Sequence, residues 1–145
     1  MTATARALVE QLQAVSEAFI ELVESVSPNQ WPRLPSPGTW SASKDAEHVA
    51  EGNALHQWVV RSTLRQRPGA RPIVERARMT AQMSQLDVVE LLRERKRESV
   101  NLIAPLGDTE LALPCRTGSL GEFIERVLIG HIRTHHREIA SKLRR

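Results

Sequence analysis

Apolar residues in this chain recur at alternating steps of four and three, a spacing that puts them on one side of an α-helix. The first such run lies between Thr4 and about Ser27. Two further runs begin at Ser84 and Ser119, each of which has an acidic residue three positions later, as helix starts often do. The spacing therefore predicts amphipathic helices. The apolar positions of the first run are Leu8, Leu12, Val15, Phe19, Leu22 and Val26.

Proline and glycine separate these runs, because proline lacks the amide donor that a helix interior needs. The proline-rich stretch 28–38 ends the first helix, and Ser41 is a suitable N-cap for a second helix that reaches about Gln66. The segment from 67 to 83 is long for a hairpin connection and fits a crossover between parallel helices. A loop with a short extended piece at 111–113 is expected before the last helix.

The third and fourth helices also carry apolar stripes, although Lys96 interrupts the third, and the fourth is expected to reach about Leu143. A chain of 145 residues has a common size for one domain with one core. We expect an all-α four-helix bundle that forms a single domain over residues 1–145. The third stripe consists of Leu86, Val89, Leu92, Val100 and Ile103, and the fourth of Leu120, Phe123, Ile124, Val127 and Leu128.

Three histidines point toward this predicted core. Each residue of a helix advances by about 100°, so His131 and His135 fall on the stripe of the fourth helix, whereas His136 falls at its edge or outside it. His48 belongs to the second helix and is expected at a similar depth if the two helices are antiparallel neighbours. On its own helix, His48 shares a line with Gly52, Leu55 and Val59.

A buried imidazole needs a hydrogen-bond partner, a neighbouring acid or a metal ion, because its nitrogens lose contact with water. An ordinary core histidine is the simple alternative for each ring alone. The spacing of His131 and His135 lets two rings converge on one ion, and His48 supplies a third ligand. Zinc is the first expectation, with nickel, iron and manganese as alternatives. Ile132 stands where a zincin has its catalytic glutamate, which disfavours a metalloprotease.

Two acidic residues lie within one turn of His48. Asp45 and Glu51 are candidates to orient this ring or to transfer a proton, and the alternative is that they face solvent, as most helix acids do. Trp40 and Trp58 are expected to serve packing.

Arginines supply the candidate sites for anions. Arg133 and Arg137 flank the histidines and are placed to meet an anionic substrate, whereas the run 93–97 alternates charges as solvated helix faces do. The single cysteine, Cys115, is surrounded by no nucleophile motif.

Several classes of protein are disfavoured. One cysteine permits no intramolecular disulfide, and charged and polar residues interrupt the apolar ones in the N-terminal MTATARALVEQLQ, so we expect a cytoplasmic protein without a membrane span. Nucleic-acid binding is disfavoured because the net charge is only +3, aromatic residues make up 3% and tyrosine is absent.

The histidine segments resemble those of a known family. Trp40 and Ser41 open a helix, His48 follows seven residues after Ser41, and the paired-histidine segment 131–139 follows the sequence Gly-Ser-Leu-Gly-Glu at 118–122. In this order the motifs are similar to those of the DinB-like family of four-helix metalloproteins. The resemblance covers nearly the whole chain and implies an up-down-down-up bundle with a long crossover between its second and third helices.

The resemblance implies that His48, His131 and His135 ligate a divalent metal ion. Glu138 stands where the family often has a glutamine, and it is interpreted as a residue behind the ligands or at the helix end. Characterised relatives include metal-dependent transferases and isomerases that use low-molecular-weight thiols such as mycothiol or bacillithiol.

Three neutral histidines leave at least one position on the ion open, as catalytic sites do. We therefore expect a thiol transferase or a hydrolase with a small-molecule substrate, acting as a homodimer. The alternative is an interaction module in which the metal is structural or absent. The sequence assigns no role to His136.

Overall fold

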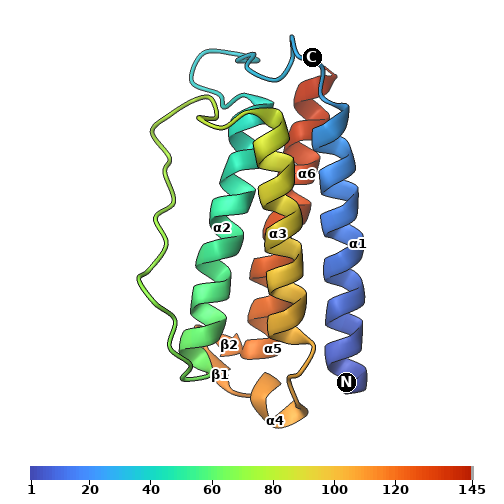
Figure 1. The fold of residues 1–145 in the computed structure, drawn as a ribbon, viewed down its shortest axis with the longest axis vertical. Helices are drawn as coiled ribbons and strands as arrows, with labels where there is room; N and C mark the ends of the chain where they lie inside the picture. Colours follow the sequence, from blue (N-terminus) through green and yellow to red (C-terminus); the bar gives the residue numbers. More distant parts are fainter. Residues whose placement is uncertain (145) are drawn as a thin grey trace.

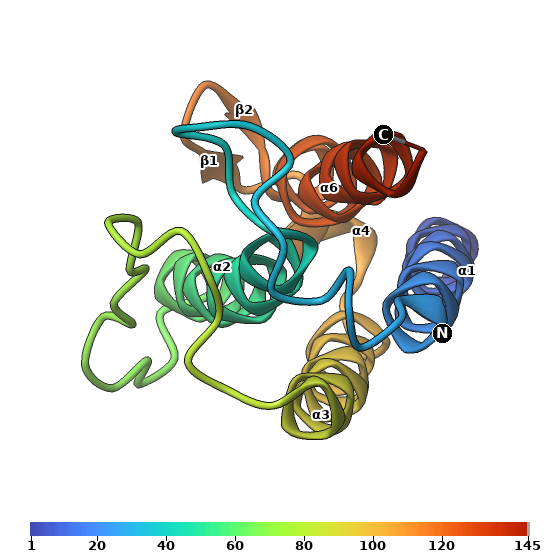
Figure 2. The ribbon, with the colours of Figure 1, turned by 90° about the horizontal axis from the view of Figure 1, so that it is seen from above.

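Four long helices lie side by side along the length of the molecule in the computed structural model, which describes residues 1–144 (Figure 1). Viewed from above, the helices form a four-sided arrangement in which α2 contacts both α3 and α6 (Figure 2). The prediction of an all-α fold is confirmed. The long helices are α1 (Ala3–Ser25), α2 (Ala42–Thr63), α3 (Gln85–Ile103) and α6 (Gly130–Leu143).

Side-chain caps fix where the helices begin. The hydroxyl groups of Ser41 and Ser84 accept hydrogen bonds from the amides three residues later, which would otherwise lack a partner in the first turn. Helix α2 ends at Thr63, three residues before the predicted end, because Arg65 adopts the left-handed conformation with φ of 57°.

The connection between α3 and α6 differs from the expected loop. Its first part is a short helix, α4 (Asp108–Leu111), so the prediction of an extended piece at 111–113 is wrong. The strands β1 (Pro114–Cys115) and β2 (Gly118–Ser119) follow as a small antiparallel hairpin, and α5 (Leu120–Phe123) begins at a capping box formed by Ser119 and Glu122.

The predicted fourth helix contains a π-helical turn, η1 (Ile124–Ile129), between α5 and α6. The amide of Gly130 reaches back five residues to the carbonyl of Glu125, which is the hydrogen bond of a π-helix. The wider turn shifts the phase of the helix, so Val127 is 38% exposed although the regular helical period places it inward. Leu128 and Ile129 are fully buried instead.

Helix α3 packs its apolar stripe against α1 with one exception. Leu86, expected in the stripe, is 69% exposed in the first turn. Lys96 is accommodated because its ammonium group forms an ion pair with Glu17 of α1 over 3.5 Å. Among residues 1–144, no helix combines the length and the apolar character needed to cross a membrane.

The crossover between α2 and α3 runs along the outer side of α2 (Figures 1 and 2). Polar side chains from the first turns of α2 hold it there. The carboxylate of Glu47 accepts hydrogen bonds from the amides of Gln82 and Met83, and the hydroxyl of Ser43 accepts one from Ala81. The fully buried ammonium group of Lys44 forms an ion pair with Glu75 over 2.7 Å. The crossover is therefore fixed at the end of α2 that carries His48.

Candidate metal centre

The structure brings His48, His131 and His135 together between two neighbouring helices. His48 lies in the second turn of α2, and the other two lie one turn apart in the first half of α6. Nε2 of His48 is 3.1 Å from Nε2 of His131. One ring nitrogen from each of the three histidines lies within 4.8 Å of the others.

This spacing fits a tetrahedral metal ion. Two nitrogens that each lie about 2.0–2.1 Å from such an ion are roughly 3.3 Å apart, which is close to the separation between His48 and His131. Without an ion, two neutral Nε2 atoms at this distance share a single hydrogen bond. The residues present therefore suit a divalent ion that prefers nitrogen ligands.

Burial keeps two of these rings neutral. Loss of solvent is the main cause that lowers the pKa of His48 to about 4 and that of His131 to about 3, and nearby positive groups add to the effect. A neutral ring retains a lone pair on one nitrogen, whereas a protonated ring has none to offer a metal. Both side chains are therefore in their ligating form at neutral pH.

Asp45 is fully buried and contacts His135 rather than solvent. Its Oδ1 accepts a hydrogen bond from Nδ1 of His135 over 2.9 Å, and its Oδ2 accepts one from the ammonium group of Lys142. Burial alone would raise the pKa of Asp45, but these two bonds outweigh it and hold the pKa below the usual value. The expectation that Asp45 faces solvent is thus wrong, and the ring that it orients is His135 instead of His48.

The bond to Asp45 determines which nitrogen of His135 is free. Since Nδ1 must carry the proton that it donates, Nε2 keeps its lone pair and is available to a metal. Glu138 adds a second carboxylate oxygen 3.1 Å from the same Nδ1, and burial raises the pKa of Glu138. Glu138 therefore lies next to the same ring nitrogen as Asp45.

The other two rings lack such partners. Nδ1 of His48 and Nδ1 of His131 are buried and form no hydrogen bond with residues 1–144. Among residues 1–144, carboxylates therefore contact the Nδ1 atom of His135 but not that of His48 or His131.

Gly52 makes room for His131. A Cβ atom at position 52 would lie 2.6 Å from Cε1 and 3.0 Å from Nδ1 of the His131 ring, closer than van der Waals contact allows. Gly52 lies one turn after His48 on the same face of α2. The absence of a side chain thus lets the ring from α6 lie directly against α2.

Two more aromatic rings border the cluster. Trp40 packs edge to face against His48 with 5.0 Å between ring centroids, so it serves packing as expected. His56, which was not predicted at the site, packs against His131 at 5.2 Å and against Phe123 at 5.9 Å. Its position two turns after His48 on α2 was the available signal.

His136 points away from the cluster, as the helical phase predicts. Its ring lies 6.5 Å from that of Phe19 on α1. Glu51 lies in the third turn of α2, where it accepts a hydrogen bond from the amide of Glu75, and burial raises the pKa of Glu51.

The remaining candidates lie outside the cluster. Cys115 is buried in the hairpin, where its sulfur accepts a hydrogen bond from the hydroxyl of Thr63. Arg93 and Arg95 form ion pairs with glutamates on the surface of α1 and α3. Arg133 and Arg137 are exposed and line an open hollow of about 430 Å³ that His131 also borders.

Comparison with known proteins agrees with the geometry. No curated protein and no solved structure matches the chain significantly. The family model described as the DinB superfamily matches residues 11–139, which include all three converging histidines, Asp45 and Glu138. This chain therefore belongs to the DinB superfamily.

Proposed function

We propose that this protein binds one divalent metal ion through the Nε2 atoms of His48, His131 and His135. The observation that carries the proposal is the convergence of three rings from two helices, with two Nε2 atoms 3.1 Å apart. The bond from His135 to Asp45 supports it, because it leaves the third Nε2 unprotonated. Zinc is the metal that this set of ligands suits first.

We further propose that the site is catalytic and of the thiol-transferase type, with metal-assisted hydrolysis as the alternative reaction. Three protein ligands leave a tetrahedral ion one position for a small molecule. A divalent ion held there acts as a Lewis acid, which lowers the pKa of a thiol or a water molecule in the open position. The chain itself supplies His48 and His131 in neutral form and fixes the orientation of His135 through Asp45.

The directions of the four long helices support an up-down-down-up bundle, the topology that the family resemblance implies. In Figure 1, α1 and α6 run toward one end of the molecule, whereas α2 and α3 run toward the other, with the crossover between them. In this arrangement α2 and α6 are antiparallel neighbours, which suits a site built from one histidine on α2 and two on α6.

Elemental analysis of natively purified protein tests the proposal. We expect about one divalent ion per chain in the wild type and loss of the ion when His48, His131 or His135 is changed to alanine. His136→Ala is the matched control, because this ring lies on the same helix but faces α1, and it should keep the metal. Assays of the metal-bound protein with low-molecular-weight thiols and electrophilic acceptors then test the reaction. Stoichiometric metal that His131→Ala retains would contradict the ligand set.

A further inference from the structure

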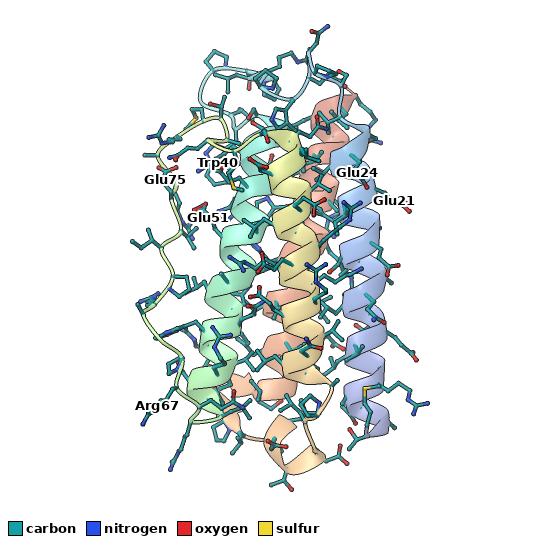
Figure 3. All side chains as sticks on the ribbon, viewed as in Figure 1. Glu21, Glu24, Trp40, Glu51, Arg67 and Glu75 are labelled. Carbon is teal, nitrogen blue, oxygen red and sulfur yellow. The ribbon has the colours of Figure 1, made fainter. Side chains whose placement is uncertain are left out.

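Side chains of the long helices fill most of the space between them (Figure 3), but a small cavity remains in the middle of the bundle. Its volume is about 10 Å³, close to the space that one buried water molecule needs. All four long helices contribute to its lining. Two of the lining residues are polar, Ser16 on α1 and Asn53 on α2. The apolar ones are Phe19, Ile20, Val49, Leu92 and Ile132.

Both polar side chains are buried without a hydrogen-bond partner. Ser16 is 6% exposed and Asn53 is 5% exposed. Within residues 1–144, Oδ1 of Asn53 accepts no hydrogen bond and the hydroxyl group of Ser16 forms none. An amide or a hydroxyl that leaves water loses free energy unless a new partner replaces the lost hydrogen bonds. The cavity that both residues line is the place where such a partner fits.

The next polar pair along α2 shows how two side chains satisfy each other directly. Gln57, one turn after Asn53, donates from Nε2 to Oγ of Ser99 over 2.8 Å. The same nitrogen donates to the carbonyl oxygen of Arg95 over 3.1 Å. Ser16 and Asn53 form no such bond with each other in the described chain, although they line the same cavity. Their polar groups therefore need a third group between them.

The lining limits the chemistry of that group. Among residues 1–144, no charged side chain lines the cavity, so an ion there would be buried without a counterion. An apolar ligand would leave the hydroxyl and the amide unpaired. Water both donates and accepts, and a buried water molecule typically makes about three hydrogen bonds.

We propose that one ordered water molecule binds in this cavity and bridges Ser16 and Asn53. The bridge joins α1 to α2, which lie diagonally opposite each other across the bundle (Figure 2).

This water site is separate from the candidate metal centre. Val49 and Asn53 directly follow His48 and Gly52, so they lie about 100° around α2 from the face that carries the histidine. The water site therefore does not depend on a bound metal ion.

Oxygen-17 relaxation dispersion tests the proposal, because it counts the water molecules that a protein retains for long times in solution. We expect the wild type to retain about one such water more than the double variant Ser16→Ala/Asn53→Leu, which lacks both polar groups. The double variant should fold, because alanine and leucine favour a helix more than serine and asparagine do. Replacing both partners of a polar contact by apolar groups also costs little. Asn101→Leu is the matched control, because this asparagine is exposed on α3, and it should retain as many waters as the wild type.

A crystal structure of the wild type gives a second readout. We expect density for one water molecule within hydrogen-bond distance of Oγ of Ser16 and of the side-chain amide of Asn53. Equal water counts in the wild type and the double variant would overturn the proposal. A direct bond between Ser16 and Asn53, with no density between them, would overturn it as well. If the double variant does not fold, the density in the wild type decides: one water peak supports the site, and its absence refutes it.

Discussion

Asp45 on α2 accepts a hydrogen bond from Nδ1 of His135 on α6 over 2.9 Å, so a carboxylate of one helix fixes the orientation of a ring on another. The same carboxylate binds the ammonium group of Lys142 near the end of α6. One buried acidic group thereby links the candidate metal centre to the packing of the two helices that form it.

Changing Asp45 to asparagine should lower the affinity for zinc by about 10- to 100-fold, the usual effect of losing a partner behind a ligating histidine. An amide removes the negative charge that favours the Nδ1-protonated ring, and it leaves Lys142 without its counterion. Competition with a chromophoric chelator measures the affinity. Glu138→Gln is the control, because this carboxylate is half exposed, and it should show a smaller loss. Equal losses in both variants would contradict the primary role given to Asp45.

Changing Gly52 to alanine should reduce zinc affinity by displacing the ring of His131, which would lie 2.6 Å from the new Cβ atom. Alanine favours a helix by about 1 kcal/mol over glycine, so the helix itself is not weakened by the change. Gly130→Ala is the control: it also adds a methyl group within a helix, but its nearest neighbour is 3.7 Å away. Chelator competition measures the effect of each change on zinc affinity, and thermal unfolding measures its effect on the stability of the fold. Unchanged zinc affinity in Gly52→Ala would show that the ring moves aside at no cost.

The stability of the metal-free protein should fall as the pH drops below about 6.5. Burial lowers the pKa of His48 and His56 to about 4 and that of His131 to about 3, whereas an unfolded chain titrates near 6.5. Between pH 6.5 and these lower values, the unfolded state therefore binds more protons than the folded state. The free energy of unfolding has its full value above this pH range and decreases as the pH falls through it. At the acid end of this pH range, the raised pKa values of Glu51 and Glu138 have the opposite effect on stability, because the folded state binds more protons at these two groups than the unfolded state does.

Urea unfolding between pH 7 and 5 measures this loss. His56→Phe removes one of the titrating rings. It should reduce the slope of the free energy of unfolding against pH by about 1 kcal/mol per pH unit. A free energy of unfolding that stays constant from pH 7 to 5 would contradict the buried neutral state of these rings.

Changing Lys44 to methionine should release the crossover from α2. The ammonium group of Lys44 holds Glu75 through two bonds, and the hydrogen bond from Lys44 is the main cause that lowers the pKa of Glu75. We expect trypsin to cleave after Arg76 and Arg78 several times faster in this variant. Lys96→Met is the control, because Lys96 pairs with Glu17 on α1 and does not contact the crossover. Equal cleavage rates in both variants would show that other contacts fix this segment.

The long helices could be predicted from the sequence because their signals are local. Apolar spacing marks the buried face, and serine caps at positions 41, 84 and 119 mark three of the starts. Helical phase also separated His135 from His136 correctly. The family was identified from the same short segments, and the family model confirms it.

The features that the sequence did not reveal depend on contacts between elements. Asp45 looked like a surface residue because its partners, His135 and Lys142, are some 90 positions away in the chain. The burial of Lys44 depends on where the crossover returns. The place of His56 beside the cluster depends on its contacts with Phe123 and His131, which lie on other helices. The extended piece was misplaced and the hairpin was not predicted, because β1 and β2 have two residues each, too few for a periodic signal.

The π turn η1 divides the last helix into two halves, and its winding sets the rotation of one half relative to the other. Its hairpin-side half is held by the burial of Leu120 and Phe123, and its far half carries His131 and His135. If these six residues formed a regular α-helix, the far half would be rotated by about 100° relative to the near half, because a turn of π-helix takes about one residue more than a turn of α-helix. Such a helix would keep nearly all of the helical content and lose the convergence of the histidines. The ligand geometry thus depends on the winding of a six-residue segment that contributes no ligand itself.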